Sequence, residues 1–455
     1  MSYKLSIVKN KMMKRIINIL ILLCCIASLS SCGNSTEERS RVLKIYNWAD
    51  YIDEDVLAEF PDWYKQQTGE DLRIIYQVFD INEIMLTKIE RGHEDFDVVC
   101  PSEYIIERML RKDLLLPIDR NFGHTPDYIP NVSPYIRHEL NKTSQPERQT
   151  EDYAVPYMWG TAGILFNKKF ITAEEADTWD ILWDSKNRGK ILMKDSYRDA
   201  YGTAIIYAHA RELADSTVTV EQLMNDNSPQ AIALAEQRLK EMKPNIAGWE
   251  ADFGKEMMTK NKAWINFTWS GDAVWAIEEA DAVGVELDYT VPCEGSNIWY
   301  DGWVIPKYAG NPKAAAYFIN YLCRPDIALR NMDAIGYVSA VATPEIMEAK
   351  QDTAIATRSD LSYFFGEGVG ADSLQINPVQ YPDRKVVERC AMIRDFGNRT
   401  ELVLEMWSRV KGDNLNTGIV LLIFSVFGVL FVWLVYGKIR KYRQKQRRHR
   451  RRRRR

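Results

Sequence analysis

The sequence predicts an α/β protein built from two lobes with a cleft between them. In the first third of the chain, patterns of strand, turn and helix follow one another three times. That order implies a parallel sheet with helices on its faces. The chain has 455 residues, of which 46% are hydrophobic, so it can bury a large core. A chain of this length is expected to form two domains or lobes rather than one.

The three repeats each pair an apolar strand with a helix. They are expected at 42–48 with 55–67, at 72–79 with 82–91, and at 96–100 with 104–110. Pro61 falls inside the first helix, and we expect it to kink or split that helix. Ligands of open parallel sheets lie beyond the carboxyl ends of the strands. The turns that follow these strands are therefore candidate binding positions.

Two of these turns place acids beside aromatic residues. The candidate residues in and around them are Trp48, Asp50, Tyr51, Ser102 and Tyr104. An organic cation suits such a surface because a carboxylate attracts the ammonium group and ring faces cover the methylene groups.

The chain is expected to cross into the second lobe at 154–161, after the polar region 121–152. Elements predicted there are strands at 163–167, 191–194 and 263–269 and helices at 200–213 and 229–242. Asp199 follows one of these strands, and Trp269 and Asp272 lie at the end of another. An aromatic residue and a carboxylate thus lie beyond a strand again.

The segment 297–306 is expected to be a strand that returns to the first lobe. Trp299 and Asp301 are two residues apart and therefore share one face of that strand. The alternative interpretation is an aromatic pair at a sheet edge with an aspartate in a turn. For Asp50, Asp199 and Asp272 the alternative role is that of a helix cap, since all three lie where helices are expected to begin.

A helix at 311–322, a turn that contains Tyr337 and an amphipathic helix at 400–411 complete the body. We predict that lobe 1 comprises 42–160 and 301–345, that lobe 2 comprises 161–300 and 346–411, and that 32–41 is a linker.

The amino end predicts an exported lipoprotein. Residues 1–31 contain no acid, and Lys14 and Arg15 precede an apolar run, as in a signal peptide. Leu29 and small residues then lead into Cys32, a pattern that resembles a bacterial lipobox. Cys32 is therefore the predicted lipidation site and the first residue of the mature protein.

The carboxyl end predicts a membrane anchor. Residues 418–437 form an apolar run that is long enough to span a bilayer as a helix. Residues 438–455 contain 13 Lys or Arg and no acid, so we expect this tail in the cytoplasm and the body in the periplasm. Nucleic-acid binding by the arginine run is the less favoured alternative.

The exported body is acidic. Residues 32–437 contain 41 Lys and Arg against 63 Asp and Glu, a net charge of −22. Such a field attracts cations and repels nucleic acid and phosphate, so no nucleic-acid partner is expected.

Other chemistry has little support in the sequence. The histidines are not at metal-ligand spacings, and no Cys-x-x-Cys motif occurs, so no metal or cofactor is expected. Pairing among Cys100, Cys293, Cys323 and Cys390 cannot be deduced. Hydrolase and nucleotide-binding motifs are absent, which predicts a binding protein and not an enzyme. A glycoside hydrolase that uses paired carboxylates and a polyamine-sensing receptor are the alternatives.

Five separated segments resemble the spermidine/putrescine-binding proteins of bacterial ABC transporters. They are Ile45-Tyr46-Asn47-Trp48-Ala49-Asp50-Tyr51, Asp97-Val98-Val99-Cys100-Pro101-Ser102, Val155-Pro156-Tyr157-Met158-Trp159-Gly160, Trp299-Tyr300-Asp301 and Ile335-Gly336-Tyr337. The resemblance runs from about 42 to 411. It implies a type II periplasmic-binding-protein fold, in which two lobes joined by a hinge close on a polyamine, and a permease partner that receives it.

The resemblance also implies which residues bind the ligand. Those at matching positions are Trp48, Asp50, Tyr51, Ser102, Tyr104, Asp199, Trp269, Trp299, Asp301 and Tyr337. Asp272 is similar to a residue of the putrescine-selective members. The chain departs from the family at Ala49, at Ser196, where a second acid is expected, and near Ile393, where a glutamine is expected. These departures leave the choice between putrescine and spermidine open.

Overall fold

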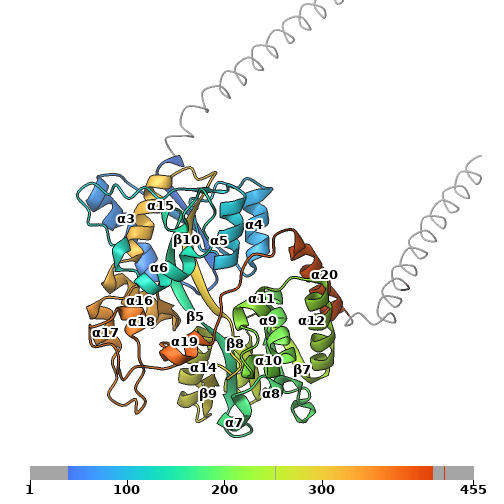
Figure 1. The fold of residues 1–455 in the computed structure, drawn as a ribbon. Helices are drawn as coiled ribbons and strands as arrows, with labels where there is room; N and C mark the ends of the chain where they lie inside the picture. The colour runs from blue at the N-terminus through green and yellow to red at the C-terminus, as the bar shows by residue number, and fades with distance from the viewer. Residues whose placement is uncertain (1–38, 252, 413–424, 426–455) are drawn as a thin grey trace, which may run out of the picture. The chain divides into compact units, whose positions relative to one another are not determined.

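The computed structural model describes residues 39–251, 253–412 and 425 (Figure 1). The chain divides into two compact units, one that ends at Asn398 and one that begins at Arg399. The second unit contains helix α20 (Thr400–Gly412), which confirms the helix predicted at 400–411. All other elements described below belong to the first unit, which also contains nearly all of both predicted lobes.

Within the described residues, eleven strands form one mixed sheet. They are β1 (Val42–Trp48), β2 (Arg73–Phe79), β3 (Val98–Val99), β4 (Leu115–Leu116), β5 (Ala154–Asn167), β6 (Ile191–Lys194), β7 (Ile246–Glu250), β8 (Ile265–Trp269), β9 (Leu287–Thr290), β10 (Ile298–Pro306) and β11 (Val338–Ser339). The strand order is β2-β1-β3-β10-β5-β8-β6-β7, with β4 on β10 and with β9 and β11 on β5.

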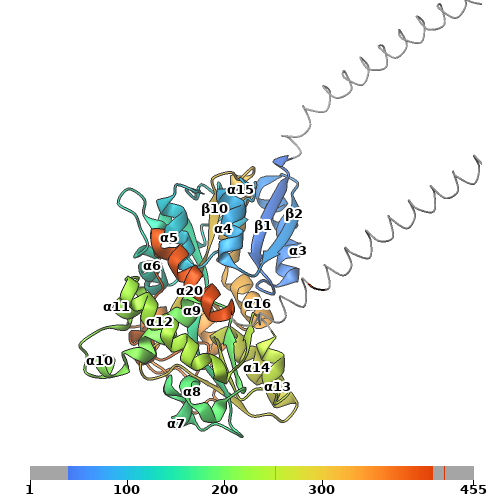
Figure 2. The same ribbon diagram turned by 90° about the vertical axis from the view of Figure 1, so that its right-hand side faces the viewer.

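The outer parts of this sheet are parallel and its centre is antiparallel. Strand β1 pairs in parallel with β2 and β3, which confirms the parallel sheet predicted from the three repeats (Figure 2). Strand β6 pairs in parallel with β7 and β8. Between these parts, β10 runs antiparallel to both β3 and β5.

Strand β5 joins the two parts of the sheet. All 14 of its residues are buried. Residues 154–161 pair with β10, whereas residues 162–167 pair with β8 and β9. The predicted crossing at 154–161 and the strand predicted at 163–167 are therefore one continuous strand.

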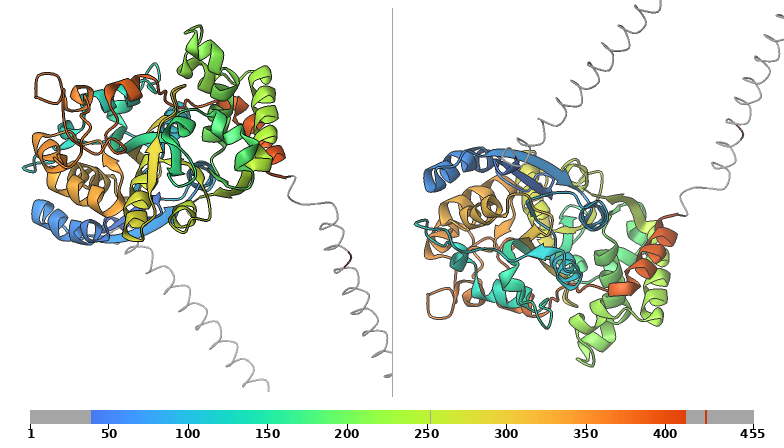
Figure 3. Two further views of the ribbon diagram at one scale, coloured as in Figure 1. Left: turned by 90° about the horizontal axis from the view of Figure 1, so that it is seen from below. Right: turned by 90° about the horizontal axis from the view of Figure 1, so that it is seen from above.

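Helices lie on both sides of the strands (Figure 3). The helices of the first unit are α3 (Glu54–Thr68), α4 (Asn82–Glu90), α5 (Glu103–Arg111), α6 (Pro134–Asn141), α7 (Ala173–Ala176), α8 (Asp180–Trp183), α9 (Tyr197–Ala208), α10 (Ala210–Ala214), α11 (Val220–Asn225), α12 (Pro229–Met242), α13 (Gly254–Thr259), α14 (Ser270–Ala282), α15 (Pro312–Leu322), α16 (Pro325–Ile335), α17 (Pro344–Lys350), α18 (Ser362–Phe365) and α19 (Arg384–Glu388).

Pro61 was predicted to kink or split the first helix, and the split is wrong. Helix α3 runs for 15 residues with Pro61 in its interior. The Asp53 side chain caps its amino end, and Gly69 ends it in the left-handed conformation at φ 78°. Phe60 and Tyr64, on either side of Pro61, are buried. These caps and the burial of both rings offset the hydrogen bond that proline cannot donate.

The helix predicted at 200–213 is also different in the structure. It begins earlier, at Tyr197, because Ser196 accepts a hydrogen bond from the backbone of the first turn. It ends at Ala208, and His209 separates it from the short helix α10. This earlier start places Asp199 inside the first turn of α9 and not before the helix.

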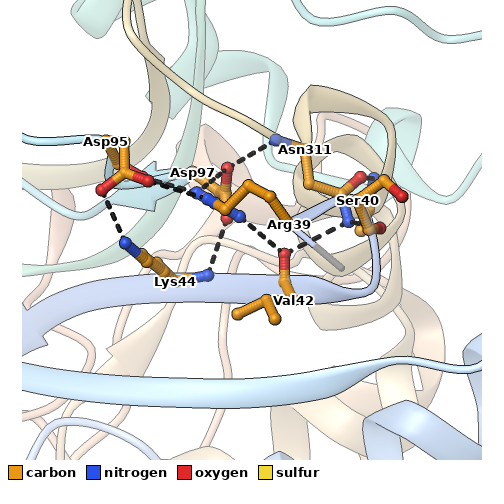
Figure 4. A network of polar contacts seen from close by, with 8 residues as sticks. Arg39, Ser40, Val42, Lys44, Asp95, Asp97 and Asn311 are labelled. Carbon is orange, nitrogen blue, oxygen red and sulfur yellow. Dashed lines mark hydrogen bonds and ion pairs between the residues drawn. The ribbon is translucent and has the colours of Figure 1, made fainter. Parts of the chain in front are cut away.

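A polar network holds the end of the predicted linker 32–41 on the sheet (Figure 4). Arg39 donates to Asp95 at 2.8 Å and to Asp97 at 2.9 Å. Asp97 is fully buried and also accepts from the backbone N–H groups of Lys44 and Asn311, both at 2.7 Å. Residue 39 is therefore joined to the body and is not part of a free linker.

Among the described residues, no helix is both long and apolar enough to cross a bilayer. The predicted signal peptide 1–31, the lipidation site Cys32 and the basic tail 438–455 lie outside those residues. The predicted transmembrane span 418–437 also lies outside them, except for Ser425.

Candidate functional site

One cavity of about 890 Å³ collects the predicted site residues. Its lining includes the carboxyl ends of β1, β2, β6 and β8, as expected for an α/β sheet. All eleven predicted residues contribute to its wall: Trp48, Asp50, Tyr51, Ser102, Tyr104, Asp199, Trp269, Asp272, Trp299, Asp301 and Tyr337. The structure therefore brings them together, although they come from positions almost 300 residues apart.

Asp301 lies on β10, where the pairing register with β5 shifts between Asp301 and Gly302. Its side chain is buried, and Oδ2 accepts a 2.8 Å hydrogen bond from the Tyr51 hydroxyl. Within the described residues, Oδ1 has no hydrogen-bond partner. Burial raises the pKa of Asp301 to about 6, although the nearby hydroxyls of Ser102 and Tyr51 oppose this rise. Asp301 therefore contributes a carboxyl group with one unsatisfied, buried acceptor atom to a residue position that lines the cavity.

Aromatic rings stand beside Asp301. Trp299 lines the cavity with Asp301, as their shared strand face predicts, whereas Tyr300 between them does not. The Tyr337 ring lies edge-on to Trp299 at 5.6 Å and to Tyr51 at 5.1 Å between ring centroids. Together these rings form an apolar wall next to a carboxylate.

Asp199 is a second buried carboxylate in the cavity wall. It accepts hydrogen bonds from the Ser196 hydroxyl at 2.6 Å, the Asn297 amide at 2.9 Å and the Trp269 indole at 3.4 Å. Burial raises the pKa of Asp199 despite these bonds. Its alternative role as a helix cap is wrong, because Ser196 is the cap of α9.

Asp272 lies in the first turn of α14 and already faces a cation. Its Oδ2 is 2.6 Å from Nζ of Lys194, and its Oδ1 accepts a 2.9 Å hydrogen bond from the Tyr337 hydroxyl. Burial opposes ionisation, but the Lys194 ammonium holds the pKa of Asp272 below its usual value. Asp272 does not cap its helix either, since the cap position of α14 is Trp269.

Gly271 explains how Tyr337 reaches Asp272. A Cβ atom at Gly271 would lie 2.3 Å from carbon atoms of the Tyr337 ring, which is too close for any side chain. The absence of that atom lets the ring lie flat against the start of α14. The glycine of the Trp-Ser-Gly-Asp sequence is therefore a packing requirement of the cavity wall.

Ser102 and Tyr104 belong to a second polar group. The Asn82 amide donates to Ser102 at 3.1 Å and to Tyr104 at 3.2 Å. Glu83 accepts from the hydroxyls of Tyr104 at 3.1 Å and Tyr197 at 3.0 Å. Because Tyr197 comes from α9 and Glu83 from α4, this group ties two sides of the cavity together.

Asp50 and Trp48 lie at the end of β1. Asp50 is exposed and adopts a positive φ of 49° in the turn, and Asp53 rather than Asp50 caps α3. The Trp48 ring packs against Phe79 at 4.5 Å between centroids. Its indole N–H is buried and lacks a partner among the described residues.

Sequence reasoning did not identify several buried, charged residues of the cavity wall. The most important is Lys194, the last residue of β6, whose side chain is only 1% exposed. Glu250 and Glu103 are also buried in the cavity wall, and Glu103 accepts from the backbone N–H of Tyr300 at 3.0 Å. A lysine that ends an apolar strand, where ligands are expected, is the signal that could have identified Lys194.

The cavity wall is strongly acidic. Twelve carboxylic acids and three basic residues line it, which favours a cation over an anion as its occupant. Burial raises the pKa of Glu103 well above its usual value, which disfavours the charged form of this acid. Asp199, Asp272 and Asp301 are the carboxylates that lie beside the aromatic rings of the wall.

Residues 62–357 match the family of bacterial extracellular solute-binding proteins. The spermidine/putrescine-binding periplasmic protein of Escherichia coli K12 is 26% identical over 373 residues, which cover 82% of this chain and 92% of that protein. The putrescine-binding periplasmic protein PotF of the same organism is 29% identical over 334 residues, or 70% of this chain and 84% of that protein.

A solved structure of another bacterial protein has a similar fold. The chain superimposes on a putative spermidine/putrescine ABC transporter protein from Listeria monocytogenes with a TM-score of 0.65 and 28% identity. The match covers 82% of this chain and 99% of that one. It confirms the predicted periplasmic-binding-protein fold.

Proposed function

Because the chain belongs to the bacterial extracellular solute-binding proteins, we propose that it captures a polyamine in the cavity and delivers it to an ABC transporter permease. Members of this family bind and transport substrates and are not enzymes. The relatives named for spermidine and putrescine support a polyamine as the ligand of this chain as well.

The observation that carries the proposal is the state of Asp301. A buried carboxylate with an unsatisfied Oδ1 is costly unless a cation or donor completes it. A ligand ammonium group supplies both the charge and the N–H donors. Trp299 and Tyr337 beside it offer ring faces and apolar area for the methylene groups that follow the ammonium.

Contacts across the cavity support closure of the two predicted lobes around the ligand. Tyr197 and Tyr337 each donate to an acid on another element, Glu83 and Asp272 respectively. Such hydrogen bonds form only when the two walls approach each other. In this proposal the ligand joins the same walls through its ammonium groups and stabilises the closed arrangement.

Calorimetry of the purified full-length chain in detergent tests the ligand class. Putrescine and spermidine are compared with neutral sugars of similar size. We expect saturable binding of at least one amine and no binding of the sugars. Sugar binding without amine binding would contradict the proposal and favour the glycoside hydrolase alternative.

We also propose that the protein is anchored in the cell membrane with its body in the periplasm. The lipobox at Cys32, the apolar run 418–437 and the basic tail 438–455 support this arrangement. Protease added to intact spheroplasts should digest the body and spare the tail. Loss of the tail with a protected body would show the reverse orientation. Radiolabelled fatty acid should be incorporated in the native chain but not after Cys32→Ala.

A further inference from the structure

We propose that Lys194 is a resident ammonium group that fills one of three cation positions in the cavity, so that the site selects a ligand with two positive charges over one with three. This inference rests on the proposed function, because it assumes that the ligand is a polyamine. It names a diamine as the preferred ligand and Lys194 as the residue that sets this preference.

Lys194 has the surroundings that a ligand ammonium would need. Its Nζ lies 2.6 Å from Asp272 and 3.1 Å from Glu250, and it donates to the backbone oxygen of Ala251 at 2.9 Å. It also lies 4.7 Å from the centroid of the Trp269 ring. Three oxygen acceptors satisfy the three N–H donors of an ammonium group, and the ring face adds a cation–π contact.

The Lys194 side chain carries a positive charge in this position. Burial disfavours the charged form, but the carboxylates of Asp272 and Glu250 together raise the pKa of Lys194 above its usual value. Lys255 adds a second cation at 3.7 Å from Asp272. Two acids therefore face two lysines, so Asp272 and Glu250 are already paired with resident cations.

Two buried carboxylates remain available in the cavity. Neither Asp199 nor Asp301 forms an ion pair within the described residues. Arg198 follows in the same helix, but its guanidinium donates to the backbone oxygen of Arg394 at 2.6 Å and lies 3.5 Å from the centroid of the Phe396 ring.

The charge of Asp199 contributes to the raised pKa of Asp301, so the two carboxylates interact electrostatically. A ligand with two ammonium groups would neutralise both acids. The third ammonium of a triamine would meet Lys194 and be repelled, or would have to remain outside the cavity.

Contacts along the cavity wall connect the Lys194 ammonium to the Asp301 end of the cavity. Tyr337 bonds to Asp272 and its ring touches those of Tyr51 and Trp299, so the resident ammonium and the Asp301 position share one aromatic wall. A longer ligand that extends along this wall from Asp301 therefore reaches the position that Lys194 occupies.

Competition binding with the full-length chain in detergent tests the proposal, with putrescine and spermidine as probes. The native chain should bind putrescine at least tenfold more tightly than spermidine. Lys194→Met should improve spermidine binding at least tenfold relative to putrescine, because Asp272 and Glu250 become available to a third ammonium. Lys313→Met removes an exposed lysine from a surface ion pair and should leave the ratio unchanged.

A second variant controls for misfolding of Lys194→Met. Lys194→Met leaves two buried acids facing each other, so the double variant Lys194→Met with Glu250→Gln retains only the charge of Asp272 there. It should show the same gain for spermidine with a melting temperature closer to that of the native chain.

The outcomes separate this inference from the proposed function. If the native chain binds putrescine but neither folded variant changes the ratio by more than threefold, the role of Lys194 is refuted and polyamine binding stands. Tighter binding of spermidine than of putrescine by the native chain also refutes it. If native chain and variants bind no amine, the proposed function fails and this inference fails with it.

Discussion

The Tyr51 hydroxyl donates a 2.8 Å hydrogen bond to Oδ2 of Asp301, although 250 positions separate the two residues in the chain. This bond holds Oδ2 of the carboxyl group and leaves the buried Oδ1 without a partner in the described structure. Asp301 is thereby pre-organised to receive a cation. Its behaviour on mutation and with pH can be stated in advance.

Asp301→Asn should weaken polyamine binding by about two orders of magnitude or more. A charge-assisted hydrogen bond contributes roughly 1.5–3 kcal/mol, and loss of one member of a desolvated pair costs about 2–5 kcal/mol. Each 1.4 kcal/mol corresponds to about a tenfold change in the dissociation constant. Titration calorimetry measures the effect. Asp281→Asn, an exposed change of the same kind, is the control and should alter affinity little. Binding of Asp301→Asn within about threefold of the native value would place the anchor elsewhere.

Polyamine affinity should fall in acid. The pKa of Asp301 is about 6 in the ligand-free protein, and an ammonium ligand needs the ionised form. Affinity is therefore near its full value from about one unit above this pKa and decreases as the pH falls through it, by about tenfold per pH unit below the pKa if one proton is involved. Calorimetry between pH 5 and pH 8 would measure the profile. The profile of Asp301→Asn should be flatter over the same range.

Asp301→Asn should stabilise the ligand-free protein. The folded state raises the pKa of Asp301 from 3.8 to about 6, so between these values the folded chain binds more protons than the unfolded one. The contribution of Asp301 to stability therefore declines as pH rises through this window and stays unfavourable above it. At pH 8, Asp301→Asn should increase the free energy of unfolding by roughly 1–3 kcal/mol. A decrease in urea unfolding experiments would contradict this expectation.

Gly271→Ala should reduce binding by about tenfold or more, equivalent to about 1.4 kcal/mol. The new Cβ atom would overlap the Tyr337 ring, displace it and break its hydrogen bond to Asp272. Gly202→Ala is a matched control, since its Cβ would meet only the flexible Met224 side chain and alanine favours the helix. Unchanged affinity in Gly271→Ala would show that the position of Tyr337 is unimportant.

Arg39→Ala should lower the free energy of unfolding by about 1–3 kcal/mol. It removes the cation beside the buried Asp97 carboxyl, whose pKa burial already raises. Urea unfolding followed by tryptophan fluorescence would measure the loss. Arg120→Ala breaks a more exposed ion pair with Asp127 and should cost less than about 1 kcal/mol. Equal losses in the two variants would show that burial of Asp97 is not decisive.

Local patterns were sufficient to predict the parallel pairing of β1, β2 and β3 and part of the cavity wall. Alternation along a strand placed Trp299 and Asp301 on one face, and the rule for strand ends selected the turns after β1 and β8. These features depend only on residues that are close in sequence, so local patterns were enough to predict them.

Features that depend on distant pairing could not be predicted. Lys194 and Asp272 are 78 residues apart, and no local pattern indicates that they form an ion pair. The position of β10 between β3 and β5 likewise follows from long-range packing. Helix α3 continues through Pro61 because its capped ends and buried rings outweigh a local signal.

The sheet pairing of β5 also has a consequence for the order of folding. All of its partners, β8, β9, β10 and β11, come later in the chain, and the first of them begins only at Ile265. A buried strand of 14 residues thus leaves the ribosome about 100 residues before any partner exists. Such non-local pairing slows folding and exposes unpaired backbone to aggregation in the meantime. The nascent chain therefore has to be kept unfolded or shielded until most of its length has been synthesised.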